Sequence, residues 1–344
     1  MLSPPAGVRI SFGELAKLLR DVFVSAGVLA DHAAILGENC AQCERDGSLS
    51  HGIFRIPGYL ASLRSGWVDG RAIPIVQQTG AAFLSVDARN GFAQPALAAA
   101  RMQLTQMARD AGAAVLAIRD SHHFSALWPD TEPFAMDGFV AIAVVSGLAC
   151  VAPSAGAKPL LGTNPIAFAA PVSGGNPLIF DQSTSMMSNG DLRIAAREGS
   201  TLSENAGVDR FGHPTADPRA ILDGGALLPF GGYKGASIAL MVEILAAALT
   251  GGQFAHQVDF SRHPGAETPR TGQLLIVIDP DRAHGGDAAR RIAELLGTLR
   301  AGGVMRLPGD RRFEQRRQSD RDGIALVPDR LRELRAWAAA ALSS

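Results

Sequence analysis

A short polar joint, Arg45-Asp-Gly-Ser-Leu-Ser-His-Gly-Ile-Phe-Arg55, separates two apolar helical segments of this chain. Its glycines, Gly47 and Gly52, allow the positive φ or the close backbone approach that a tight joint needs. The joint therefore predicts a fixed turn between two helices, with polar side chains presented on it.

Three of those side chains have the chemistry of an active site: Ser50, His51 and Arg55. An imidazole can give or take a proton near neutral pH, and a guanidinium matches a carboxylate with a planar fork. A proton donor four residues before a carboxylate anchor suits an enzyme that acts on a small α-substituted acid. Alternatively, Ser50 and His51 cap the next helix and Arg55 pairs with a surface acid.

The composition predicts a globular protein of two or three domains, because the chain has 344 residues. Its 47% hydrophobic and 19% charged residues favour buried cores over disorder. A net charge of −1 argues against a nucleic-acid partner. No apolar run is long enough to span a membrane, so no membrane partner is expected.

The three cysteines, Cys40, Cys43 and Cys150, are an odd number in a large chain without a secretory signal. We therefore expect reduced thiols and a cytoplasmic protein. Cys40 and Cys43 form a C-x-x-C inside a helical pattern, without a second pair or a nearby histidine. They are expected to be small buried residues, and no metal site is expected.

The periodicity of apolar residues predicts the elements in order. Helices are expected at about 11–25 (with a capping box at Ser11 and Glu14), 31–44, 56–64, 94–111 (ending at Gly112), 128–136, 231–249, 288–299 and 329–342. Strands are expected at 82–87, 113–118, 139–145, 178–181 and 273–279, and loops at 150–170, 199–225 and 306–312. The β-α-β-α-β rhythm of residues 82–145 predicts a layered α/β sheet.

Two segments could bind phosphate, although no Gly-x-Gly-x-x-Gly follows an expected strand and no Walker loop is present. Gly231-Gly-Tyr-Lys-Gly235 opens a helix, whose N-terminus favours an anion, and Lys234 adds charge. The basic loop Arg306-Leu-Pro-Gly-Asp-Arg-Arg312 can grip a phosphate. The alternatives are a helix start that needs glycine for packing, and a solvated surface turn.

Histidines at the end of an expected strand, His122 and His123, are either ligand-facing residues or one buried and one exposed ring. Ser50, His51 and Asp191 could form a hydrolase triad. However, adjacent side chains usually point apart, and no Gly-x-Ser-x-Gly elbow is present. We expect Ser50 and Asp191 to orient or polarise His51 instead, which leaves His51 as a proton donor.

The motifs taken together resemble one family, the non-Rossmann malate/L-lactate dehydrogenases, over roughly residues 10–325. The resemblance rests on Ser50-His51-Gly52…Arg55, Ser121-His122-His123-Phe124, Gly162-Thr-Asn-Pro165, Asp181-x-x-Thr-Ser185, Gly190, Asp217-Pro218 and Gly231-Gly-x-Lys-Gly235. Within the family the chain is most similar to the Δ1-piperideine-2-carboxylate/Δ1-pyrroline-2-carboxylate reductases. That similarity rests on His51-Gly-Ile-Phe-Arg-Ile-Pro-Gly-Tyr-Leu60, Gly91-Phe-Ala-Gln-Pro-Ala-Leu97, Ser125-Ala-Leu-Trp-Pro-Asp130, residues 220–230 and the 306–312 loop.

The resemblance implies a fold and a function. It implies an NADPH-dependent homodimeric reductase, with NADH as a possible cofactor, whose cofactor domain is built on a mostly antiparallel sheet. The implied domains are a helical unit at 1–75 packed with helices from 286–344, a sheet/helix segment at 76–120, and a cofactor- and substrate-binding domain at 121–285.

The resemblance also implies roles for individual residues. His51 would be the proton donor, with Ser50 and Asp191 as its relay. The substrate would contact Arg55, Thr163, Asn189 and Gly190. The cofactor would contact His123, Phe124, Ser125, Ala126, Leu127, Asp181, Gln182, Ser183, Tyr233, Lys234, Arg306, Leu307, Pro308, Gly309, Asp310, Arg311 and Arg312.

Three hypotheses follow for function. The first is reduction of a cyclic imino acid to L-pipecolate or L-proline, and the second is a 2-hydroxy-acid dehydrogenase acting on a 2-oxo acid. The third is a non-catalytic or hydrolytic protein on the same fold. Compared with the reductases, the chain departs at Asn189 and Tyr233, where His is expected, and at Ser146, where Asn is expected. Asn189 and Ser146 bear on the choice between the first two hypotheses, and Tyr233 bears on the preference for NADP over NAD.

Overall fold

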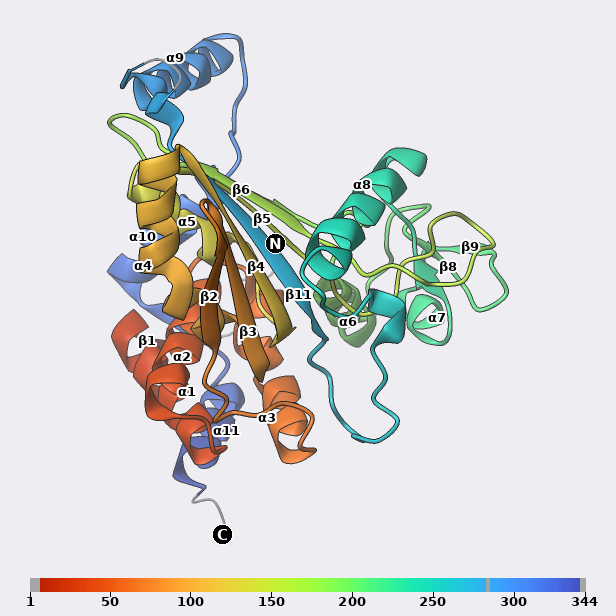
Figure 1. The fold of residues 1–344 in the computed structure, drawn as a ribbon. Coiled ribbons are helices and arrows are strands. Elements are labelled where there is room, and N and C mark those ends of the chain that lie inside the picture. Colours follow the sequence, from red (N-terminus) through yellow and green to blue (C-terminus); the bar gives the residue numbers. More distant parts are fainter. Residues whose placement is uncertain (1–6, 283–284, 341–344) are drawn as a thin grey trace.

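A seven-stranded sheet forms the centre of the computed structural model, which describes residues 7–282 and 285–340 (Figure 1). Its strand order is β2 (Ile75–Gly80), β3 (Phe83–Phe92), β4 (Ala113–His122), β11 (Arg270–Ile278), β5 (Val140–Val145), β6 (Ile166–Ala170) and β7 (Leu178–Gln182). Neighbouring strands in this sheet run antiparallel, except for the parallel pair β3 and β4. The expected layered fold with a mostly antiparallel sheet is confirmed.

One edge of the sheet gathers the segments that carry polar motifs. Because β11 is antiparallel to both β4 and β5, and β6 is antiparallel to both β5 and β7, the strands β4, β5 and β7 point the same way. Their C-terminal ends therefore meet the N-terminal ends of β6 and β11 at this edge. His123, Ser146, Pro165, Gln182 and Pro269 all lie within two residues of these ends.

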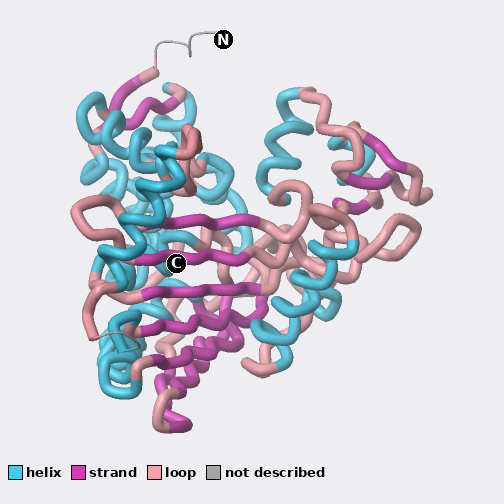
Figure 2. The backbone as a smooth tube through the Cα atoms, turned by 90° about the horizontal axis from the view of Figure 1, so that it is seen from above, coloured by secondary structure: helices cyan, strands magenta, loops and turns pink. Residues whose placement is uncertain are grey.

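Helices cover both faces of the sheet (Figures 1 and 2). One face packs on α4 (Ala93–Ala111) and α5 (Trp128–Met136), and the other packs on α8 (Tyr233–Glu243) and the π-helical turn η3 (Ile244–Ala248). Side chains alternate along β11, so Leu275 joins the first core and Leu274 joins the second. Both are buried, so each face of the strand is enclosed.

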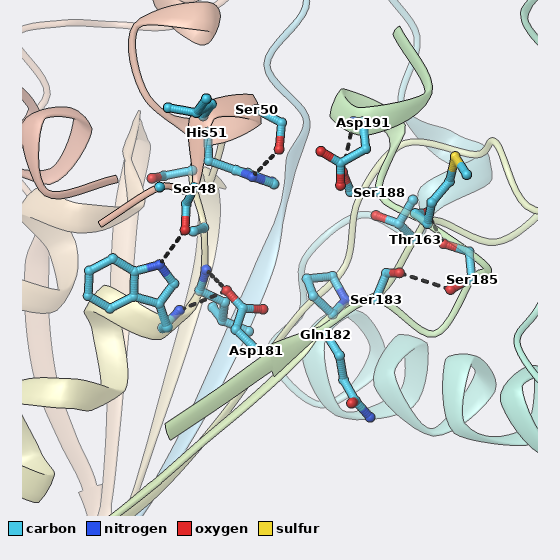
Figure 3. Close-up of a pocket in the computed structure, with 18 of the residues that line it drawn as sticks. Ser48, Ser50, His51, Thr163, Asp181, Gln182, Ser183, Ser185, Ser188 and Asp191 are labelled. Carbon is cyan, nitrogen blue, oxygen red and sulfur yellow. Dashed lines mark hydrogen bonds between the residues drawn. The ribbon is translucent and has the colours of Figure 1, made fainter. Parts of the chain in front are cut away.

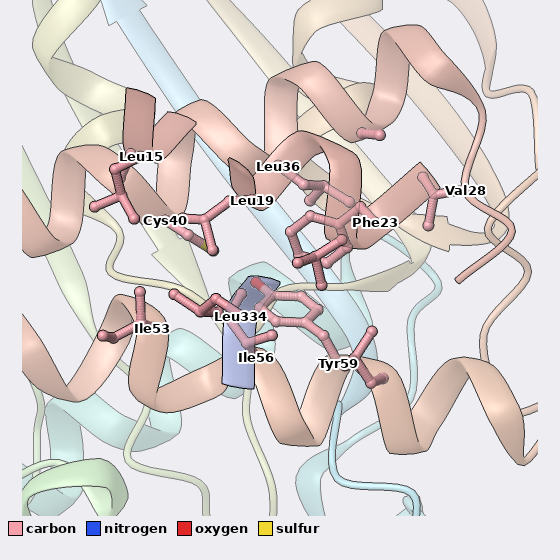
Figure 4. Close-up of a cluster of buried hydrophobic side chains, with 14 of the residues drawn as sticks. Leu15, Leu19, Phe23, Val28, Leu36, Cys40, Ile53, Ile56, Tyr59 and Leu334 are labelled. Atoms are coloured by element: carbon pink, nitrogen blue, oxygen red, sulfur yellow. The ribbon is translucent and has the colours of Figure 1, made fainter. Parts of the chain in front are cut away.

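A separate helical core lies against the motif-bearing edge (Figure 4). It joins α1 (Phe12–Ser25), α2 (Ala30–Arg45), α3 (Ile56–Arg64) and α11 (Pro328–Ala339). Phe23 meets Tyr59 edge to face, with ring centroids 5.3 Å apart, and Leu334 from α11 is buried in the same cluster. A two-stranded sheet of β1 (Val8–Ile10) and β12 (Ile324–Leu326) also ties the two ends of the described chain together.

Several local expectations are confirmed. The capping box of α1 forms between Ser11 and Glu14, and Gly112 ends α4 with φ 85°. The helices expected at 56–64 and 128–136 match α3 and α5 residue for residue.

Several elements were not expected from the sequence, among them β6, α6 (Asn189–Glu198) and α10 (Asp310–Asp322). The prediction of a loop at 306–312 is wrong for its last three residues, because the helix α10 begins at Asp310. Among the side chains of α10 only Phe313 and Ser319 are buried, so the helix lacks the apolar repeat that predicts one. α6 likewise buries only Gly190 and Leu192.

The remaining elements are short or peripheral. The segment 199–225 holds β8 (Gly207–Val208), β9 (Pro214–Thr215) and α7 (Pro218–Leu222), followed by β10 (Ala226–Leu227), and β8, β9 and β10 form a small three-stranded sheet. The helix α9 (Ala288–Ala301) and the 3₁₀ turns η4 (Ala255–Gln257) and η5 (Pro280–Arg282) complete the list. No helix within the described ranges is long and apolar enough to cross a membrane.

Candidate active site

A cavity of about 860 Å³ opens at the motif-bearing edge of the sheet (Figure 3). We call it the pocket. One side, the joint wall, is Gly47–Arg55, of which Gly47–His51 line the pocket, and the opposite side, the β7–α6 wall, is Asp181–Asp191. A smaller hollow of about 90 Å³ shares His51, Ser125, Thr163 and Pro165 with the pocket. His51 therefore lies where a large cavity meets a small one, an arrangement that suits a large cofactor beside a small substrate.

The joint wall is built from two 3₁₀ turns, η1 (Leu49–His51) and η2 (Ile53–Arg55). Gly47 enters the first turn with φ 78°, a conformation that favours glycine. Ser50 Oγ lies 2.9 Å from His51 Nδ1. The expectation that these neighbouring side chains point apart is wrong, because in this tight turn the short hydroxyl reaches the Nδ1 edge of the adjoining ring.

Glu44, at the end of α2, holds the joint from behind. Its Oε2 accepts a hydrogen bond from the backbone N–H of Ile53 at 2.9 Å. A Cβ at Gly52 would overlap the same carboxylate oxygen, so the close approach inferred from the sequence is real. Glu44 is 8% exposed, and burial raises its pKa to about 7 despite that hydrogen bond.

Arg55 is aimed into the hollow by two contacts. Its Nε donates to the carbonyl oxygen of Ser50 at 2.8 Å, and its guanidinium lies 4.4 Å from the ring centroid of Phe124. A Cβ at Gly190 would come within 2.8 Å of Arg55 Nη2, so glycine there lets α6 pack on the joint. Burial lowers the pKa of Arg55 to about 10, and the side chain remains a cation at neutral pH.

The surroundings of His51 disfavour its protonated form. Burial first, and then the positive charge of the nearby Arg55, hold the pKa of His51 well below its usual range. A carboxylate bound to Arg55 would offset the second of these causes. The arrangement thus links the protonation of His51 to the binding of a carboxylate ligand in the hollow.

Asp191 lies on the β7–α6 wall, across the pocket from His51 (Figure 3). Its carboxylate accepts a hydrogen bond from Ser188 Oγ at 2.8 Å, and Ser188 caps α6. Within the described ranges, no hydrogen bond joins Asp191 to His51. The relay through Asp191 stays a prediction.

Asp181 and Arg312 form the floor of the pocket near α5. Asp181 accepts from the backbone N–H groups of Leu127 and Trp128 at 2.7 and 3.0 Å, and burial raises its pKa. The guanidinium of Arg312 lies 4.5 Å from the ring centroid of Trp128. Its Nη1 is buried without a hydrogen-bond partner in the part of the chain that the structure describes. A buried donor of this kind is a ready contact for an anion.

The structure gathers most of the residues expected at the site. Those lining the pocket are Ser50, His51, Ser125, Ala126, Leu127, Thr163, Asp181, Gln182, Ser183, Asp191, Arg311 and Arg312. Those lining the hollow but not the pocket are Arg55, His123, Phe124 and Asn189. Ser146 also lines the hollow.

Other expected residues line neither the pocket nor the hollow: Gly190, Tyr233, Lys234, Arg306, Leu307, Pro308, Gly309 and Asp310. Asp310 binds Arg300 and the N–H of Leu307. Tyr233 is 76% exposed at the start of α8.

Sequence reasoning missed several lining residues: Ser48, Ser185, Met186, Met187, Ser188, Ile194 and Phe230. Most of them lie in irregular chain between β7 and α6, where no periodicity marks an inward face. The only signal was the run of hydroxyl residues after β7. No group of three or more His, Cys, Asp or Glu side chains suited to a metal ion occurs among residues 7–282 and 285–340.

Comparison with known proteins identifies relatives over nearly the whole chain. The family model described as malate/L-lactate dehydrogenase matches residues 10–335. A Delta(1)-pyrroline-2-carboxylate/Delta(1)-piperideine-2-carboxylate reductase of Pseudomonas syringae pv. tomato is 58% identical, over 94% of this chain and 96% of the relative. A reductase of the same name from Pseudomonas putida is 54% identical, over 95% and 96%.

A solved structure agrees with these sequence matches. The crystal structure of delta1-piperideine-2-carboxylate reductase from Pseudomonas syringae superposes with a TM-score of 0.94 at 58% identity, covering 96% of this chain and 99% of the other.

Proposed function

The chain belongs to the malate/L-lactate dehydrogenase family, and from this premise we propose that it is an NADPH-dependent reductase of cyclic imino acids. The substrates would be Δ1-piperideine-2-carboxylate and Δ1-pyrroline-2-carboxylate, and the products L-pipecolate and L-proline. The observation that carries the proposal is the hollow in which His51, Arg55 and Thr163 face one another beside a larger pocket. The names and the high identity of the two Pseudomonas relatives support the same substrate class.

Arg55 binds the substrate carboxylate in this proposal and so fixes which face of the ring is presented. Thr163 contributes a hydroxyl to the same hollow, and Asn189 closes it from the start of α6. Since Arg55 is itself held by Ser50 and Phe124, the anchor is rigid before substrate arrives.

His51 supplies the proton that the ring nitrogen needs when hydride reaches C2. Binding of the substrate carboxylate at Arg55 offsets a positive charge that disfavours the protonated ring. Ser50, bonded to Nδ1, orients the imidazole so that Nε2 is the nitrogen available for transfer. Asp191 completes the proposed relay once the two walls of the pocket come together around a ligand.

The pocket fits a nicotinamide dinucleotide in size and in chemistry. When bound, the cofactor supplies the hydride. Arg311 and Arg312 present guanidinium groups for phosphate, and the buried, unpartnered Nη1 of Arg312 supports this role. Two arginines favour NADPH over NADH, since the former carries an additional phosphate. The other proposed cofactor contacts on the pocket wall are Ser125, Ala126, Leu127, Asp181, Gln182 and Ser183.

The second candidate is a 2-hydroxy-acid dehydrogenase, favoured by the description of the matched family model. Reduction of C=O and of C=N needs the same hydride donor, carboxylate anchor and proton source.

One assay separates the two candidates. NADPH oxidation is followed by absorbance with both cyclic imines, pyruvate and oxaloacetate as substrates, and each reaction is repeated with NADH. We expect the cyclic imines with NADPH to give the highest kcat/KM. A preference for an open-chain oxo acid would replace the first candidate with the second.

We also propose a homodimer. The helix α8 and the turn η3 that continues it expose large apolar side chains, with Leu240 at 55%, Ile244 at 52% and Leu249, just after η3, at 48% exposed. An apolar patch of this kind often marks a protein interface. Light scattering should give a mass of twice 35.9 kDa, and charged substitutions at Leu240 and Ile244 should halve it. A monomeric wild-type protein would disprove the dimer.

A further inference from the structure

Two adjacent histidines at the end of β4 have different surroundings. His122 is bound at both ring nitrogens: Nε2 lies 3.0 Å from Asn90 Oδ1 and Nδ1 lies 2.9 Å from Thr268 Oγ1. Burial lowers the pKa of His122 to about 3, and the ring lines neither cavity. His122 therefore acts as a structural residue. His123 lines the hollow, together with His51 and Arg55.

A buried carboxylate holds the far side of the His123 ring. His123 Nε2 lies 2.8 Å from Asp130 Oδ2, and the two side chains are 2% and 3% exposed. Gln273, also buried, donates from Nε2 to the same oxygen at 2.6 Å. Since Asp130 Oδ2 already accepts from Gln273, we take His123 Nε2 as the second donor to this oxygen.

In the neutral ring with its proton on Nε2, the other nitrogen, His123 Nδ1, carries a lone pair. It has no hydrogen-bond partner among the described residues, and its ring lines the hollow. An acceptor backed by a buried negative charge thus faces the same small space as the cationic Arg55. The hollow combines a cation with a hydrogen-bond acceptor, a pair that is complementary to a small molecule with a carboxylate and an N–H group.

This inference rests on the reductase activity proposed above. We propose that His123 recognises the protonated ring nitrogen of the substrate. Asp130 and Gln273 act as positioning residues that hold the His123 ring. A protonated cyclic imino acid carries a carboxylate for Arg55 and an N–H for His123 Nδ1. A 2-oxo acid has the carboxylate but offers only a carbonyl oxygen, which cannot donate. His123 is therefore a specificity determinant for C=N over C=O substrates.

The two histidines then have separate tasks, and the proton count balances. The protonated imine enters with one N–H, which His123 accepts as a hydrogen bond. Hydride addition at C2 converts the C=N⁺ to a neutral secondary amine. The proton from His51 converts that amine to the ammonium form of the product.

The test compares Asp130→Asn with Thr268→Val, which loosens the neighbouring His122 in a similar way but touches neither cavity. The first measurement is the ratio of kcat/KM for Δ1-piperideine-2-carboxylate to that for pyruvate. We expect Asp130→Asn to lower this ratio at least ~10-fold, since one lost charge-assisted hydrogen bond is of that order, while Thr268→Val leaves it unchanged. Equal losses for both substrates, or a loss matched by a weaker Kd for NADPH, would overturn the proposal.

A binding measurement keeps this test independent of turnover. L-proline and cyclopentanecarboxylate have similar shapes, but only the first has a protonated nitrogen. Isothermal titration of the NADP⁺-loaded enzyme should show tighter binding of L-proline, and Asp130→Asn should abolish the difference. If that difference is found while cyclic imines are not reduced, the proposed function fails and the recognition stands.

If Asp130→Asn does not fold, Gln273→Met replaces it. This variant should lower the ratio of kcat/KM for Δ1-piperideine-2-carboxylate to that for pyruvate, and no shift in the ratio would overturn the proposal.

Discussion

The joint wall and the β7–α6 wall face each other across the pocket, and they are built differently. In the joint wall, Ser50 is buried, Arg55 is held by Ser50 and Phe124, and Glu44 lies behind the turn. In the β7–α6 wall, Gln182 and Asp191 are exposed, and the polar bonds of Ser183, Ser185 and Ser188 stay within the wall (Figure 3).

The difference indicates a division of labour. Burial shifts the pKa values of His51, Arg55 and Glu44, so the joint wall is where acid–base chemistry is tuned. The β7–α6 wall is supported by local turns and one helix cap, which suits a surface that adjusts to a ligand. Substitutions in the joint wall should therefore affect turnover more than those across the pocket.

The largest effect is expected for His51→Asn. Loss of a proton donor lowers kcat by roughly 10²- to 10⁴-fold. Asparagine retains a polar group of similar reach, so the melting temperature should stay close to that of the wild type. Steady-state NADPH oxidation and circular dichroism provide the two measurements. Turnover near the wild-type level would remove His51 from the mechanism. It would also contradict the assignment of acid–base chemistry to the joint wall.

The pH profile of the same variant adds a second readout. Because the pKa of His51 is lowered, its proton-donating form becomes populated only as the pH falls. The wild-type kcat/KM should therefore decline as the pH rises, and the decline due to this group should be missing in His51→Asn. An unchanged pH profile would assign the titration to another group.

A pair of substitutions, one in each wall, gives the smaller effects. Gly52→Ala places a Cβ against the Glu44 carboxylate and should lower the free energy of unfolding by about 1–3 kcal/mol. The shift of the joint should also lower kcat. Ser188→Ala removes the cap of α6 and should lower the free energy of unfolding by about 1 kcal/mol, with a few-fold change in kcat at most.

Urea unfolding and steady-state kinetics of both variants check this pair. Gly297→Ala is the control, because α9 leaves open space at that position and alanine is favoured within a helix. A larger loss of kcat in Ser188→Ala than in Gly52→Ala would mean that turnover depends more on the β7–α6 wall than on the joint wall.

The sequence alone determined the local elements and the chemistry of the joint. The capping box at Ser11 and Glu14, the end of α4 at Gly112 and the extent of α3 follow from short-range patterns, and each is confirmed. The Ser50, His51 and Arg55 set was visible because its residue types carry chemistry within six positions. The motifs along the chain also identified the family, which the comparisons confirm.

Only the tertiary structure decided which distant residues meet. The strand order places Thr163, Asp181 and His51 around one cavity, although more than a hundred residues separate the first two from the third. Asp130 and Gln273 lie 143 positions apart, and only the pairing of β11 with β4 and β5 brings them together behind His123. α10 escaped detection because it buries few apolar side chains, and its position depends on contacts such as those of Arg316 with Asp46 and Glu132. Local periodicity reports which face of an element is buried, whereas burial, charge and pKa at the site depend on the elements that pack against it.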